Sequence, residues 1–184
     1  LDQIGEMGTP NSAYVAPQLD YLICKIPRWD LTKFATVSRD IGSSMKSVGE
    51  IMSIGRCFEE VIQKGLRMIG QGMHGFVGNS LQFDDLDHEL SHPTDLRIFA
   101  IAVAFEKGYT VERVEELTKI DPWFLSRMKN VVDYMKKLQG YKSLDELPAD
   151  ELREAKRLGF SDFQIARFVI HPTGSTYEKE NLEV

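Results

Sequence analysis

The hydrophobic pattern of the chain changes near residue 71, and this change limits the fold more than any other feature of the sequence. Before it, a β-branched and aromatic run over residues 21–26 predicts a strand. After Gly72 there is almost no strand signal, and apolar residues recur at helical spacing. We therefore predict a mainly α fold, in which a small α+β segment over residues 1–71 precedes a helical region over residues 72–184.

The first segment is expected to contain two strands and a helix. The first strand ends at Pro27, and one helical turn capped by Asp30 is expected over residues 30–34. A second strand is expected over residues 43–48, ending at Gly49. The apolar residues of 56–69 recur every three or four positions, which predicts an amphipathic helix.

The second segment is expected to be a small helical bundle with short loops. The helices are expected over residues 81–90, 95–107, 111–119, 123–138, 149–158 and 162–170. Thr110 and Asp121 are predicted helix N-caps, and residues 161–164 read as an S-x-x-Q capping box. The longest helix is expected to bury six apolar side chains, namely Trp123, Phe124, Met128, Val131, Val132 and Met135.

Composition excludes several classes of protein. The formal net charge is −6, and no Lys/Arg cluster is dense enough to suggest nucleic-acid binding. The longest apolar stretch, residues 98–105, is too short to span a membrane. Cys24 and Cys57 are expected to be small buried hydrophobes in a reducing compartment. The chain starts at Leu1 with no signal-peptide pattern, so we expect an excised piece of a cytoplasmic protein, with a mitochondrial location as the alternative.

One short motif suggests metal chemistry. Residues His88 to His92 match H-E-x-x-H, in which two histidines on one helix face bind zinc and the glutamate acts as a general base. Here Pro93 follows directly, and a residue before proline is pushed out of the α region, so His92 is expected to leave the helix. A zinc hydrolase at His88 and His92 is therefore an alternative that we weigh below the ordinary interpretation, a solvated acidic helix end.

Two longer strings resemble a known family. Lys25 to Asp30 reads K-I-P-R-W-D, and Met45 to Arg56 reads M-K-S-V-G-E-I-M-S-I-G-R. Both are similar to the large subunit of carbamoyl phosphate synthetase. The resemblance continues in order along nearly the whole chain, through Phe58–Glu60, Gln63–Lys64, Leu66–Arg67, Pro93–Asp95, Arg97–Ile98, Ile120–Asp121, Trp123–Leu125, Ala155–Lys156, Gly159–Asp162 and Gln164–Ala166. A departure occurs over residues 15–21, which lack the family's glutamate, so we derive no site from residues 1–18.

The resemblance implies a place in a larger enzyme. In that family the large subunit has two homologous halves, each with an ATP-grasp domain. Residues 1–71 would be the C-terminal part of the first, carboxyphosphate-forming ATP-grasp domain, and residues 72–184 the helical oligomerisation domain. The parent would be a ligase that uses two MgATP to make carbamoyl phosphate from bicarbonate and glutamine-derived ammonia, for arginine or pyrimidine biosynthesis. The implied partners are the rest of the large subunit, a glutamine amidotransferase subunit or domain, and a second copy through the helical domain.

The resemblance also implies which residues carry function. The family's nucleotide and Mg²⁺ ligands lie upstream of the matched strings, so we assign no catalytic, cofactor-binding or metal residue here. The M-K-S-V-G-E segment lines the tunnel through which carbamate reaches the second site, which implies that Met45 and Glu50 are tunnel-lining residues. The ordinary alternative is that Glu50 accepts hydrogen bonds from neighbouring backbone. A stand-alone helical interaction domain remains the alternative to a role in the synthetase.

Overall fold

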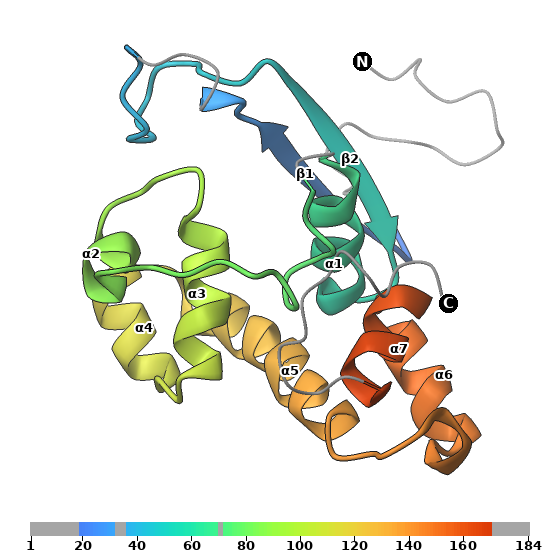
Figure 1. Cartoon of the computed structure of the whole chain (residues 1–184). Helices are drawn as coiled ribbons and strands as arrows, with labels where there is room; N and C mark the ends of the chain where they lie inside the picture. Colours follow the sequence, from blue (N-terminus) through green and yellow to red (C-terminus); the bar gives the residue numbers. More distant parts are fainter. Residues whose placement is uncertain (1–18, 32–35, 70–71, 171–184) are drawn as a thin grey trace, which may run out of the picture.

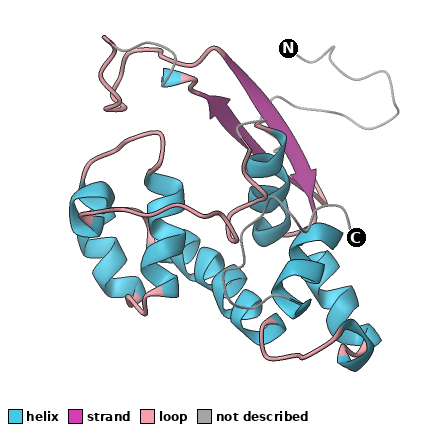
Figure 2. Ribbon diagram, viewed as in Figure 1, coloured by secondary structure: helices cyan, strands magenta, loops and turns pink. Residues whose placement is uncertain are grey.

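The computed structural model describes residues 19–31, 36–69 and 72–170. A two-stranded sheet lies along one edge of the molecule, and the helices fill the other side (Figures 1 and 2). The elements are β1 (Leu22–Arg28), β2 (Gly49–Gly55), α1 (Phe58–Met68), α2 (Leu86–Ser91), α3 (Arg97–Glu106), α4 (Val111–Thr118), α5 (Pro122–Leu138), the short 3₁₀ helix η2 (Leu144–Glu146), α6 (Ala149–Arg157) and α7 (Asp162–Ile170). The mainly α fold that the sequence predicted is confirmed.

The two strands run antiparallel, and α1 covers one face of the sheet they form. Lys25 pairs with Met52 and Ile26 with Ile51. The approach of α1 is close, because a Cβ added at Gly65 would lie 2.5 Å from the Ile26 side chain. The hydroxyl of the buried Ser53 donates to the carbonyl of Val61 at 2.7 Å, which ties β2 to α1.

The second predicted strand was placed wrongly. Residues 43–48 form no strand, and β2 begins at Gly49, where the prediction ended it. The pairing of β1 with β2 stops at Arg28 and Gly49, and Asp30 then adopts a positive φ of 47°. Only Val48 of residues 43–48 still reaches β1, through its N–H and the carbonyl of Arg28 at 2.9 Å. The residues before it have no opposing strand in the described part of the chain, and a strand needs one to satisfy its backbone. The helical turn predicted over residues 30–34 falls largely on 32–34, outside the described residues.

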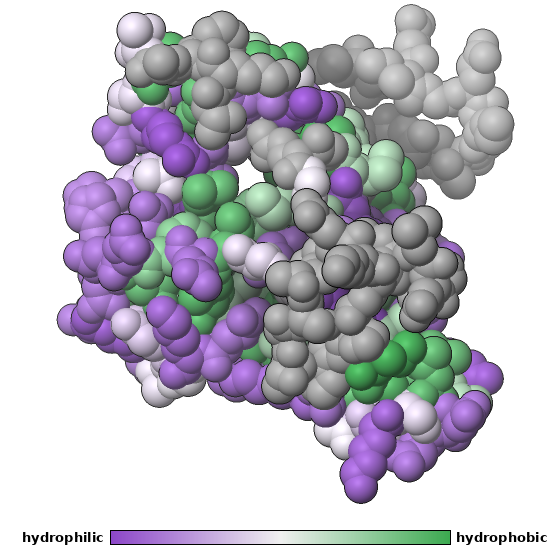
Figure 3. Space-filling view, in the orientation of Figure 1, coloured by the Kyte–Doolittle hydropathy of each residue, from purple (hydrophilic) through white to green (hydrophobic). Residues whose placement is uncertain are grey.

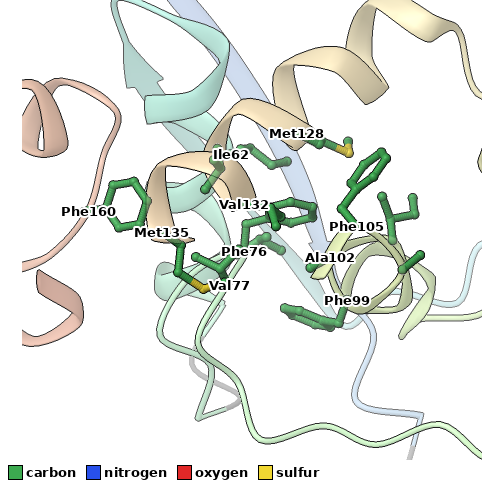
Figure 4. Close-up of a cluster of buried hydrophobic side chains, with 14 of the residues drawn as sticks. Ile62, Phe76, Val77, Phe99, Ala102, Phe105, Met128, Val132, Met135 and Phe160 are labelled. Atoms are coloured by element: carbon green, nitrogen blue, oxygen red, sulfur yellow. The ribbon is translucent and has the colours of Figure 1, made fainter. Parts of the chain in front are cut away.

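The helices pack around one hydrophobic core to which α1, α3, α5 and α7 all contribute. Figure 4 shows core side chains from α1, α3 and α5 together with Phe76, Val77 and Phe160. Fully buried side chains of this core include Leu66, Phe76, Leu90, Ile101, Phe105, Leu125, Val132, Leu138 and Phe160. Hydrophilic residues cover the side formed by α2 and α4 (Figure 3). Among the described residues, no helix combines the length and apolar character needed to cross a membrane.

The predicted helix caps are confirmed. Thr110 accepts from the backbone N–H of Arg113 at 3.2 Å, and Asp121 accepts from that of Trp123 at 2.8 Å. In the capping box of α7, the Ser161 hydroxyl accepts from the Gln164 N–H, and the Gln164 side chain accepts from the Ser161 N–H, both at 3.1 Å. These contacts satisfy backbone donors that a helix start leaves unpaired.

The burial predicted for α5 is correct for four side chains and wrong for two. Met128, Val131, Val132 and Met135 are buried. Trp123 and Phe124, however, are 50% and 43% exposed. Leu125, Met128, Val132 and Met135 belong to the inward stripe, and Trp123 and Phe124 lie at the N-terminal end of the helix, before its first buried residue. The two rings contact Phe58 of α1 instead, with centroid distances of 5.7 and 5.5 Å.

The cysteines also differ from the prediction, since both are partly exposed. Cys24 packs against the core from the edge sheet, and Cys57 is the N-cap residue of α1. Partial burial raises the pKa of both thiols. Both therefore stay protonated at neutral pH, which makes them poor nucleophiles.

Candidate functional site

The face of the sheet that points away from α1 carries the residue the sequence singled out. Side chains alternate across a strand, so Cys24, Ile26 and Ile51 pack toward the core. The opposite side chains are Ile23, Lys25, Glu50, Met52 and Ile54, and we call this set the outer face. Its apolar members Ile23, Met52 and Ile54 are 45%, 61% and 53% exposed.

Glu50 forms an ion pair with Lys25 in the middle of this apolar surface. The Nζ of Lys25 lies 2.9 Å from Oε1 of Glu50, and both side chains are about half exposed. Because Lys25 is opposite Met52 and Glu50 is opposite Pro27, the pair spans the two strands diagonally. Among the described residues, no backbone N–H hydrogen-bonds to the Glu50 carboxylate. The structure therefore does not show the alternative in which Glu50 accepts hydrogen bonds from neighbouring backbone.

Met45 lies on the long connection between β1 and β2 rather than on the sheet, and is 88% exposed. Lys46, the next residue, donates to the carbonyls of Ser38 and Asp40 at 2.9 and 2.7 Å, which closes the connection on itself. The structure thus places Met45 and Glu50 on one segment, but it is Lys25 that it brings to Glu50.

The connection is anchored to the helical region at the turn between α2 and α3. Nε and Nη2 of Arg39 donate to Oδ1 of Asp95 at 2.9 and 2.7 Å. The N–H of Ile41 donates to the carbonyl of Pro93 at 2.6 Å. The position of the loop that carries Met45 therefore depends on the helical region as well as on the sheet.

A buried polar network ties α1 to the C-terminal helices. The Gln164 amide of α7 donates to Oε1 of Gln63 in α1 at 3.2 Å and to the carbonyl of Val77 at 3.1 Å. Arg67 of α1 donates to the carbonyl of Gly159 at 2.7 Å. Helix α1 therefore packs against the sheet on one side and against the C-terminal helices on the other.

The two histidines of the H-E-x-x-H motif do not form a zinc site. His88 lies in α2, whereas His92 is its C-cap with extended backbone, as the following proline predicted. The rings are stacked, with centroids 3.9 Å apart and planes inclined by 14°. The lone pairs of parallel rings do not converge on one ion. Within the described part of the chain, no group of three or more His, Cys, Asp or Glu side chains could hold a metal.

Lys25 is the residue that sequence reasoning missed. It stands in the K-I-P-R string, but nothing local links it to Glu50, which lies 25 positions further on. The link requires the register of β1 on β2, and the sequence placed the second strand too early.

Comparison with known proteins decides the family. The model of the oligomerisation domain of the carbamoyl-phosphate synthetase large chain matches residues 50–181. The chain belongs to this family. The resemblance read from the two sequence strings is thereby confirmed, and the helical region is an oligomerisation domain of the carbamoyl phosphate synthetase large-chain type.

Curated relatives agree with the assignment. The multifunctional protein URA2 of Saccharomyces cerevisiae is 53% identical over 154 residues, covering 83% of this chain and 7% of that protein. The mitochondrial arginine-specific carbamoyl phosphate synthase large chain of Neurospora crassa is 52% identical over 160 residues, 86% of this chain and 14% of the relative. The multifunctional protein CAD of Squalus acanthias is 54% identical over 156 residues, 85% and 7%. This carbamoyl phosphate synthetase segment thus spans a seventh or less of each relative.

Proposed function

We propose that the chain is a connecting and assembly module of a carbamoyl phosphate synthetase large chain. The parent enzyme is a ligase that makes carbamoyl phosphate from bicarbonate and glutamine-derived ammonia, for arginine or pyrimidine biosynthesis. The family match over residues 50–181 and the names of the relatives support this role. The partners are the remainder of the large chain, a glutamine amidotransferase subunit or domain, and a second copy of the helical domain. We place the enzyme in the cytoplasm, with the mitochondrion as the alternative that the Neurospora relative favours.

The observation that carries the proposal is the outer face of the sheet. A two-stranded sheet is marginally stable alone, and this one has α1 on one face and exposed Ile23, Met52 and Ile54 on the other. Such a surface suits the edge of a larger domain. We therefore assign residues 1–71 to the C-terminal part of the ATP-grasp domain and residues 72–184 to the helical oligomerisation domain, with α1 packed against both.

The chemistry of the parent explains why a wall is needed. ATP phosphorylates bicarbonate to carboxyphosphate, ammonia displaces phosphate to give carbamate, and a second ATP phosphorylates carbamate. Carboxyphosphate and carbamate decompose in water, so the path between the two sites must exclude bulk solvent. We assign Met45 and Glu50 to the wall of this path, and MgATP to parts of the large chain outside this segment.

The substitution Glu50→Ala in the intact synthetase tests the wall. We expect the output of carbamoyl phosphate to fall while bicarbonate-dependent ATP hydrolysis continues, because only the transfer of carbamate is impaired. Glu116→Ala is the matched control, since Glu116 is an exposed glutamate that also pairs with a basic residue, Arg113, but lies on α4. An equal loss of hydrolysis and output in Glu50→Ala would contradict the assignment.

Calorimetry of the isolated chain tests whether this module lacks a nucleotide site, as proposed. We expect no heat of tight MgATP binding, since the residues that hold the nucleotide belong elsewhere in the parent. Tight binding would contradict the assignment of MgATP to other parts of the large chain.

A further inference from the structure

The ion pair on the outer face has chemical consequences for a passage that carries anions. Lys25 and Glu50 are 2.9 Å apart, and the side chains around them on this face, Ile23, Met52 and Ile54, are apolar. The core and α1 lie on the other face of the sheet, so neither member of the pair is needed to satisfy a buried group there. Lys25 also precedes the region that the family model matches, which begins at residue 50.

We propose that Lys25 is a further wall residue, whose ammonium group neutralises Glu50 so that an anionic intermediate can pass. The inference rests on the proposed function, because it takes Glu50 to be part of a passage for carbamate. It adds Lys25, from a different strand, to Met45 and Glu50, and it gives a reason for the pairing of Lys25 with Glu50.

The argument is electrostatic. A lone carboxylate in an apolar wall repels a carbamate or carboxyphosphate anion, and the repulsion strengthens as water is excluded. An ion pair presents almost no net charge to the same anion. An ammonium group has three N–H donors. The ammonium group contacts Glu50 on one side, and its donors offer hydrogen bonds to the carboxylate of a passing carbamate.

A purely structural role makes a different prediction. Diagonal pairs of opposite charge stabilise antiparallel strands, so Lys25 could serve only to hold β1 on β2. In that case removal of either charge, or of both, would weaken the sheet, and the double substitution would be at least as harmful as Lys25→Met alone. If Lys25 serves to neutralise Glu50, removal of both charges restores a neutral wall.

The experiment uses the intact synthetase with Lys25→Met, the double variant Lys25→Met/Glu50→Gln, and Lys129→Met as a control that breaks an exposed ion pair on α5. The readout is the carbamoyl phosphate formed per ATP hydrolysed, alongside the melting temperature of each variant. We expect the ratio to fall about tenfold in Lys25→Met, where the Glu50 carboxylate is left unpaired among apolar side chains of the passage wall, and to recover largely in the double variant.

Three outcomes would overturn the inference. They are an unchanged ratio in Lys25→Met, a double variant no better than the single one, and a fall in ratio matched by Lys129→Met. The proposed function is judged separately by Glu50→Ala. If Glu50→Ala separates hydrolysis from output while Lys25→Met does not change the ratio, the wall stands and the role of Lys25 is rejected.

Discussion

The buried amides of Gln63 in α1 and Gln164 in α7 are hydrogen-bonded to each other across 101 positions of the chain. The two side chains are 0% and 1% exposed, so water cannot replace the contact. Gln164 also caps its own helix through Ser161 and receives a hydrogen bond from Arg67. The Gln164 side chain thereby fixes both the start of α7 and the position of α1, the helix that packs against the sheet.

Replacement of this glutamine by an apolar residue of similar size tests the network. Gln164→Leu leaves Oε1 of Gln63 and the carbonyl of Val77 buried without the donor they share. We expect the free energy of unfolding to fall by about 1–3 kcal/mol, the usual cost of an unpaired buried polar group. Urea denaturation of the chain measures it, with the exposed Gln82→Leu as the matched control. Equal stability of the two variants would contradict the structural role.

Gly159 tests how closely α1 and the C-terminal helices approach. Both Gly159 and Gly108 have positive φ, 85° and 90°, so alanine at either costs about 1 kcal/mol in backbone strain. A Cβ at Gly159 would also lie 2.8 Å from Cα of Glu60, whereas one at Gly108 meets nothing within 4 Å. We expect Gly159→Ala to lose about 1–3 kcal/mol more than Gly108→Ala, as overpacked sites do. Thermal unfolding of both variants measures this difference in stability. Equal losses would show that the backbone around Gly159 and Glu60 can shift to accommodate the added methyl group.

The helices could be predicted because their signals are local. The capping box of α7 spans only Ser161 to Gln164, and the inward stripe of α5 repeats every three or four residues. Two adjacent aromatic residues before that stripe could not be placed, because periodicity alone does not say where the stripe begins. Trp123 and Phe124 were predicted to be buried for this reason, whereas the structure leaves them partly exposed.

The sheet and the candidate site depended on contacts that no local pattern encodes. The start of β2 is set by its pairing with β1, so the predicted strand ended where the real one begins. The partner of Glu50 followed from the same register. The residue itself was identified from family resemblance, because a glutamate at a strand start has no distinctive spacing.

His74 makes stability depend on mild acid. Burial, and then the positive charge of Arg167, lower the pKa of His74 below its ordinary value of 6.5. The unfolded chain therefore binds a proton more readily than the folded one. The free energy of unfolding falls as the pH drops below about 6.5, and above that pH His74 does not reduce it. We expect His74→Gln to flatten this slope in urea denaturation between pH 7 and pH 5. A titration of His74 by NMR at or above 6.5 would contradict the prediction.

Metal analysis decides the zinc alternative. The stacked rings of His88 and His92 do not converge on one ion, and the described chain offers no third ligand beside them. We therefore expect sub-stoichiometric zinc after purification in zinc-containing buffer, and a melting temperature that a chelator does not change. One tightly held zinc ion per chain, lost in His88→Gln, would restore the hydrolase interpretation.

The Arg39–Asp95 ion pair is expected to control the loop that carries Met45. Asp95 is nearly buried at the start of α3, and Arg39 reaches it from the connection between β1 and β2. In Arg39→Met the loop loses this anchor but keeps the hydrogen bond from the Ile41 N–H to Pro93. We expect the exchange of the Ile41 amide with solvent to speed up about two- to fivefold, in line with the modest value of a partly exposed pair. Arg153→Met, which breaks an exposed ion pair within α6, should leave it unchanged. Unchanged exchange in Arg39→Met would mean that the backbone contact alone holds the loop, and that the helical region positions Met45 without this arginine.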